Sequence, residues 1–140
     1  MVKPTIKMDV QGENSPEYGL AITLMNTSHV PLTVYHHALP WVGWYSAMVI
    51  AVKTDPSWTV LERRFIIDDA GPATTTIGPG ETLTGRITLV NRFHGFCEAL
   101  QEGDMVVFWS YQLQPIDDTP LERVAGHVFF RKSDITRGCE

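Results

Sequence analysis

Alternation of apolar and polar residues is the feature that most constrains what this chain can fold into. Residues 5–10 (TIKMDV) and residues 82–89 (TLTGRITL) place an apolar side chain at nearly every second position. Successive side chains of a β-strand point to opposite faces, so such a segment buries one face and leaves the other in water. Both segments are therefore predicted to be half-buried strands.

The segment Met105–Leu113 has the same alternation, but Val106 and Phe108 make its second face apolar as well. A strand that is apolar on both faces is typical of the middle of a sheet, so we expect it at the centre of the core. Apolar residues also recur at helical spacing between two glycines, which predicts one short helical turn near residues 96–102. Further strand-like runs, which bring the expected total to about eight, cover residues 20–26, 32–36, 48–52, 58–67 and 124–131.

The length and the strand pattern together predict the fold class. A chain of 140 residues has the usual length of one domain, and regular short strands are typical of sandwiches and barrels. We therefore expect a single β-sandwich domain over residues 1–140.

The order of elements adds a resemblance to this expectation. One strand ends in Asn26-Thr-Ser28, the next begins at Pro31, the turn Ile77-Gly-Pro-Gly-Glu81 opens another, and a helical turn precedes Gly103-Asp104. This order resembles that of bacterial immunoglobulin-like domains. The resemblance implies an all-β, immunoglobulin-like antiparallel β-sandwich.

The charge balance limits the classes of partner. Eleven Lys and Arg against sixteen Asp and Glu give a formal net charge of −5, which opposes the electrostatic attraction that drives non-specific nucleic-acid binding. No apolar run approaches the length of a membrane span, and no secretion signal is recognisable. Cys97 and Cys139 could form one bridge, but two cysteines at this spacing make neither a disulfide framework nor a zinc pattern. We expect a cytoplasmic protein that binds neither nucleic acid nor membrane.

Residues 36–45 (HHALPWVGWY) form the most unusual stretch of the sequence. Trp41, Trp44 and Tyr45 lie close together in a predicted loop, where aromatic side chains offer a large contact area at a low cost in conformational entropy. They are the predicted anchors for a protein partner. The alternative is that they cap one end of the sandwich, with their N–H and O–H groups bonded locally.

Acidic residues in two turns form a second candidate surface. Asp69 lies in an Asp-Asp-Ala-Gly-Pro turn, and Asp117 and Asp118 lie in a predicted hairpin between prolines. Carboxylates on projecting turns steer a basic partner, because complementary fields raise the rate of association. Turn formation and solubility are the alternative roles for these residues.

The sequence contains no strong signal for catalysis, a metal or another cofactor. His36 and His37 are weak metal candidates, since neighbouring residues of a strand point to opposite faces and no metal-ligand spacing is present. Motifs for a serine or cysteine nucleophile and for a phosphate-binding loop are also missing. We therefore expect no cofactor and no catalytic residue.

These observations predict a non-catalytic protein-binding module of the inhibitor, immunity or accessory type. Its partner would be held by Trp41, Trp44 and Tyr45 together with the acidic turns. Two alternatives stay open at this point. One is a small-molecule-binding or metal-binding module, or an enzyme, that uses the loop histidines. The other is a self-associating structural protein, a homodimer that pairs through sheet edges or through Val106 and Phe108.

Overall fold

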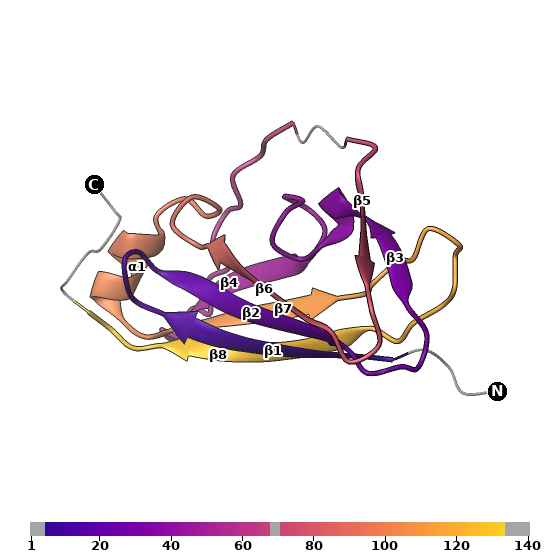
Figure 1. The fold of residues 1–140 in the computed structure, drawn as a ribbon. Helices are drawn as coiled ribbons and strands as arrows, with labels where there is room; N and C mark the ends of the chain where they lie inside the picture. Colours follow the sequence, from indigo (N-terminus) through magenta and orange to yellow (C-terminus); the bar gives the residue numbers. More distant parts are fainter. Residues whose placement is uncertain (1–4, 68–70, 134–140) are drawn as a thin grey trace.

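The computed structural model describes residues 5–67 and 71–133. Within these ranges the protein is mainly β, with antiparallel strands in three small sheets, one short α-helix and one turn of 3-10 helix (Figure 1). The elements are β1 (Ile6–Glu13), β2 (Gly19–Asn26), β3 (Leu32–Tyr35), the 3-10 turn (His36–Ala38), β4 (Met48–Lys53), β5 (Thr74–Ile77), β6 (Thr82–Thr88), α1 (Phe96–Glu102), β7 (Met105–Tyr111) and β8 (Val124–Phe130).

Two three-stranded sheets form the body of the molecule. One has the strand order β1-β2-β6 and the other β4-β7-β8, while β3 and β5 form a separate pair. In Figure 1 the first sheet lies in front and β4 and β7 lie behind it. The predicted central position of the strand that begins at Met105 is confirmed, because β7 pairs with β4 on one side and with β8 on the other. The strand ends at Tyr111, two residues before the predicted end at Leu113.

The core lies between the two larger sheets. Alternate residues of each sheet, such as Leu20, Ile22 and Leu24 of β2 and Val107 of β7, are buried in one hydrophobic cluster. The helix α1 adds Phe96 and Leu100 to the same cluster. Period-two alternation therefore predicts correctly which side of these strands is buried.

The prediction of a strand over residues 58–67 is wrong. This stretch forms only two isolated bridges, from Val60 to Val52 and from Arg63 to Phe93. Its backbone bonds first to the edge of β4 and then to residues 92–94, so no single neighbour receives a continuous ladder. An apolar, β-branched sequence forms a strand only where one partner strand runs alongside it.

Sequence reasoning missed β5 and placed the end of β3 one residue too late. Residues 74–77 are three threonines and an isoleucine, all β-branched, and they pair with β3 through Thr33 and Thr76, whose hydroxyls lie 2.9 Å apart. His36 begins the 3-10 turn instead of extending β3. The predicted helical turn is confirmed as α1.

A buried asparagine joins the turns at one end of the molecule. The side-chain amide of Asn26 donates to the carbonyl oxygens of Val30 at 2.8 Å and of Ile77 at 2.9 Å. Its side-chain oxygen accepts bonds from the backbone N–H and the hydroxyl of Ser28. Because Asn26 is fully buried, these bonds are needed to offset the loss of hydration of its polar atoms.

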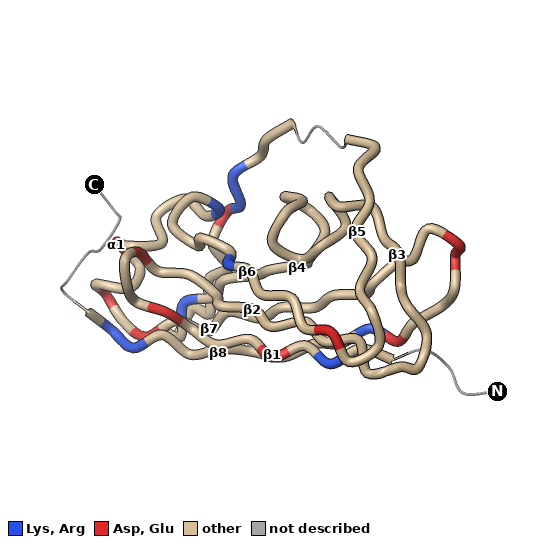
Figure 2. Tube along the Cα trace, in the orientation of Figure 1, with Lys and Arg blue, Asp and Glu red and all other residues tan. Residues whose placement is uncertain are grey.

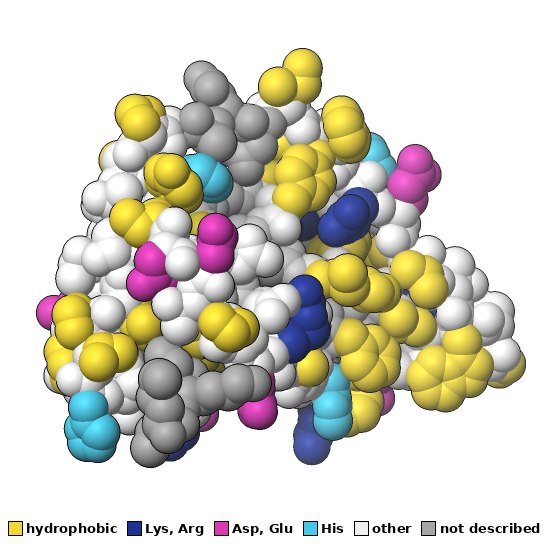
Figure 3. Space-filling model, turned by 90° about the vertical axis from the view of Figure 1, so that its right-hand side faces the viewer, with side chains coloured by type: hydrophobic (Ala, Val, Ile, Leu, Met, Phe, Trp, Pro, Cys, Tyr) yellow, Lys and Arg dark blue, Asp and Glu magenta, His cyan; other side chains and the backbone are white. Residues whose placement is uncertain are grey.

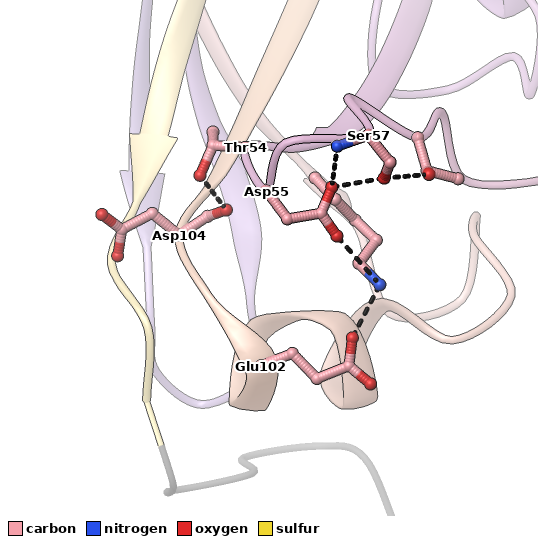
Figure 4. A network of polar contacts seen from close by, with 7 residues as sticks. Thr54, Asp55, Ser57, Glu102 and Asp104 are labelled. Carbon is pink, nitrogen blue, oxygen red and sulfur yellow. Dashed lines mark hydrogen bonds and ion pairs between the residues drawn. The ribbon is translucent and has the colours of Figure 1, made fainter.

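A network of polar contacts ties the end of β4 to α1 (Figure 4). Lys53 Nζ lies 2.6 Å from Glu102 Oε2 and 3.6 Å from Asp55 Oδ2, and the Thr54 hydroxyl donates to the carbonyl oxygen of Asp104 at 2.7 Å. The Ser57 hydroxyl donates to Asp55 and holds the pKa of that carboxyl below its usual value. These carboxylates are paired within the chain, so we interpret the network as structural.

No helix among the described residues is long and apolar enough to cross a membrane.

Candidate functional site

The aromatic loop between β3 and β4 packs onto the body of the molecule through Trp41. Its indole ring lies directly over Gly85 of β6 and contacts the hydrophobic core. Gly85 leaves the space that the ring fills, because any side chain at this position would overlap it. Trp41 therefore has the contacts of a residue that closes one side of the core.

Trp44 holds the loop to neighbouring segments. The Arg92 guanidinium lies 4.6 Å from the centre of the Trp44 ring, and its Nη1 donates to the Trp44 carbonyl oxygen at 2.7 Å. The indole N–H donates to the carbonyl oxygen of Arg64 at 3.3 Å. A stacked, hydrogen-bonded arginine of this kind fixes the ring that it covers.

Tyr45 is the most exposed of the three predicted anchors, with 42% of its surface accessible. Its hydroxyl donates to the carbonyl oxygen of Ile66 at 2.8 Å, and the Arg63 guanidinium lies 5.7 Å from its ring centre. The ring itself stays accessible beside Phe65. Of the predicted aromatic anchors, Tyr45 is thus the one with most surface available to a partner.

One of the two predicted acidic turns, at Asp117 and Asp118, lies within the described residues, in the loop between β7 and β8. Figure 2 shows acidic residues at the tip of the loop between β7 and β8, where Asp117 and Asp118 stand. Asp117 Oδ1 accepts bonds from the hydroxyl and the backbone N–H of Thr119, at 2.6 and 3.0 Å, which lower the pKa of the Asp117 carboxyl. Asp118 takes a positive φ of 60° within the same turn. Asp69 lies outside the described residues.

The two loop histidines have separate surroundings. His36 Nδ1 lies 2.9 Å from the Thr75 hydroxyl, whereas the His37 ring stacks on Tyr35 with ring centres 5.5 Å apart. The buried Nδ1 of His37 has no hydrogen-bond partner among the described residues. Over the same residues, no three His, Cys, Asp or Glu side chains gather where they would hold a metal ion. We therefore propose no metal site.

The outward surfaces of the two larger sheets differ sharply in polarity. The β1-β2-β6 sheet points charged residues and threonines outward, among them Lys7, Asp9, Thr82 and Thr84. On the β4-β7-β8 sheet, Ser110, Val52 and Val106 also point outward, but Ser110 is half-buried and the two valines are buried. The exposed side chains on this side are largely apolar, namely Met48, Ile50, Phe108, Ala125, His127 and Phe129. We call this set the outer face.

The aromatic residues of the outer face form a connected strip. His127 lies between Phe108 and Phe129, with ring centres 6.1 and 5.4 Å away. Phe129 is 65% exposed, Met48 54% and Phe108 46%. Figure 3 shows this side of the molecule at its right, where hydrophobic side chains gather with Lys and Arg side chains among them.

The sequence contained part of the signal for this surface. The apolar second face of residues 105–113 includes Phe108, and its pattern predicts either burial in the core or, as the alternative, a homodimer contact through Val106 and Phe108. The run Ala47–Val52 is likewise apolar at every position, which also leaves two apolar faces. Only the assembled sheet shows that β4, β7 and β8 align these residues on one side, where Val52 and Val106 are buried while Met48, Ile50 and Phe108 stay exposed.

Two hollows meet beside the outer face at Met48. The first has a volume of about 430 Å³ and a mixed lining that includes His37, Tyr45, Gln112 and Arg123. The second, of about 410 Å³, is mostly apolar and is lined by Ile50, Val60, Leu61, Phe93 and Arg63. Met48 lines both hollows, and we call the two together the Met48 groove.

Comparison with known proteins does not assign the chain to a family. No family model matches it, and neither does any curated protein. Among solved structures, a protein from Archaeoglobus fulgidus is similar over 93% of this chain and 97% of its own, with 11% sequence identity and a TM-score of 0.41. Function is therefore inferred from this chain's own residues.

Proposed function

We propose that the protein is a non-catalytic binding module that holds a partner protein on its outer face. The observation that carries the proposal is the exposure of Phe129, Phe108 and Met48 together on one sheet. A contiguous apolar patch of this kind marks an interaction surface, whereas single exposed apolar residues are ordinary. The outward surface of the other sheet supports this interpretation, because charged residues and threonines predominate there.

The proposed contact surface lies on the β4-β7-β8 sheet and its margin instead of on the tryptophans. Aromatic side chains on a rigid sheet lose little conformational entropy on binding, so Phe108 and Phe129 suit the centre of an interface. Tyr45 lines the adjoining Met48 groove and extends the surface towards the loop. Binding roles for Trp41 and Trp44 stay predictions, and their indole rings already have partners within the chain.

We also propose that the two larger sheets form an immunoglobulin-like sandwich. The shared core between β1-β2-β6 and β4-β7-β8 supports the sandwich, since two sheets that bury their facing side chains in one cluster make this architecture.

A capture experiment tests the function. Tagged wild-type protein and the F108S/F129S variant are incubated with lysate of the source organism, and bound proteins are identified by mass spectrometry. Both phenylalanines are exposed and lie outside the core, so the variant is expected to keep its fold, which circular dichroism checks. The matched control is V30S, which removes an exposed apolar side chain from the turn between β2 and β3.

The expected result is a partner that wild type and V30S retain and F108S/F129S loses. A partner retained equally by all three proteins would move the interface away from the outer face. No specific partner for wild type, together with a protein that is monomeric in light scattering, would refute the proposed function.

A further inference from the structure

The two halves of the Met48 groove differ in polarity, and this difference limits which kind of partner can fill it. In the first hollow, Gln112, Gln114 and Arg123 surround Met48 with polar groups. In the second, Ile50, Val60 and Leu61 present apolar side chains to the same methionine. A ligand that fills both halves therefore needs a polar end and an apolar end joined over Met48.

The charges of the groove have one sign. Among the described residues, the charged side chains that line the two hollows are Arg123 in the first and Arg63 in the second, and no carboxylate lines either. This holds on a chain whose formal net charge is −5. A positive rim on an acidic protein favours negatively charged groups on the molecule that docks there.

Arg123 has hydrogen-bonding capacity left for a ligand. Its Nη1 donates to the Ser110 hydroxyl at 3.0 Å, and its Nη2 lies 3.5 Å from Gln112 Oε1, a weak contact. A guanidinium has five N–H donors in a fork that matches the two oxygens of a carboxylate. Both bonds to neutral side chains hold the fork in place without neutralising its charge.

We infer that the partner presents an acidic and apolar segment to the Met48 groove, with a carboxylate at Arg123 and an apolar side chain against Met48, Ile50 and Val60. This inference rests on the proposed function and specifies its ligand class. A second copy of the chain fits less well. In a twofold-symmetric pair the same patch faces itself, which brings the arginines of both rims to one interface.

Selection from a displayed library of random peptides tests the inference. The wild type is expected to enrich peptides in which Asp or Glu lies near apolar residues. For the best enriched peptide, fluorescence anisotropy should show binding weakened about tenfold or more by R123Q, because a hydrogen bond to a charged group is lost. The matched control R131Q removes an arginine that lines neither hollow of the groove and should bind as wild type.

Charge reversal makes the test sharper. The R63E/R123E variant is expected to enrich peptides with Lys or Arg in place of the acidic residues, provided that its circular dichroism spectrum matches that of wild type. If R63E/R123E fails to fold, the salt dependence of wild-type binding replaces it: affinity should fall as ionic strength rises.

The outcomes separate the inference from the proposed function. Enrichment of apolar peptides without acidic residues would overturn the inference and leave binding on the outer face intact, provided that F108S/F129S loses those peptides. A dimer in light scattering that F108S/F129S dissociates, with no peptide enriched, would identify a second copy as the occupant and overturn the inference. A monomer that enriches no peptide would also overturn it, and the lysate capture would then decide the proposed function alone.

Discussion

Replacing Gly85 with alanine should destabilise the protein through one neighbour, the indole ring of Trp41. A Cβ atom at position 85 would lie 2.5 Å from Trp41 Cδ1 and closer still to Cγ and Cδ2. Carbon atoms in ordinary contact are about 3.5–4.0 Å apart, so the ring has to move away from β6. Overpacking of this kind costs about 1–3 kcal/mol of the free energy of unfolding.

The same contact predicts how Gly85→Ala and Trp41→Ala combine. Removal of the half-buried Trp41 ring should by itself cost about 2–3 kcal/mol, since the core beneath it becomes exposed. Once the ring is gone, alanine at position 85 has free space. It should then be neutral or stabilise β6 by about 0.5 kcal/mol, because glycine is unfavourable within a strand.

Urea denaturation of the wild type, both single variants and the double variant measures this coupling. The double variant should be about as stable as Trp41→Ala alone, so the two losses are strongly non-additive. Losses that add to within about 0.5 kcal/mol would refute the proposed contact between Trp41 and Gly85. Similar m-values across the four proteins would show that the comparison concerns one folded state and one unfolded state.

Two further predictions concern buried polar groups. Asn26→Ala should lower the free energy of unfolding by about 2 kcal/mol or more, because the buried carbonyl oxygen of Ile77 loses its donor, and an unchanged urea midpoint would contradict this. Tyr111→Phe should cost about 1 kcal/mol at neutral pH, because the Tyr111 hydroxyl donates to the carbonyl oxygen of Ala38 at 2.6 Å. Burial raises the pKa of Tyr111 above its ordinary value of 10.0. As pH rises above 10.0, Tyr111 ionises only in the unfolded state, so the wild type should lose its stability advantage over Tyr111→Phe. A stability difference between the two proteins that stays constant from neutral to alkaline pH would contradict the assignment.

Several elements of the fold follow from local sequence alone. Alternation over residues 5–10 and 82–89 predicts the buried side of β1 and β6, because the direction of a side chain in a strand depends only on its position along the chain. The helix α1 lies between Gly95 and Gly103 as its spacing predicts. The acidic turn at Asp117 is equally local, since the bonds that Asp117 accepts come from Thr119.

The remaining features depend on segments that are distant in sequence. Residues 58–67 have strand-forming residues, yet their hydrogen bonds divide between β4 and residues 92–94. Trp41 fits its site because β6 carries a glycine opposite it, 44 positions later in the sequence (41 to 85). Neither relation can be read from a local pattern, because each requires the positions of two segments at once.

The candidate site also combines features set by local sequence with features that depend on distant segments. The sequence by itself determined that residues 105–113 have two apolar faces and that the aromatic loop concentrates tryptophans. Tertiary structure decided which of these residues meet water: packing covers much of Trp41 and Trp44, while pairing with β4 and β8 leaves Phe108 exposed beside Phe129. The physical reason is that hydrophobicity belongs to a side chain, whereas exposure depends on whether another segment packs against it.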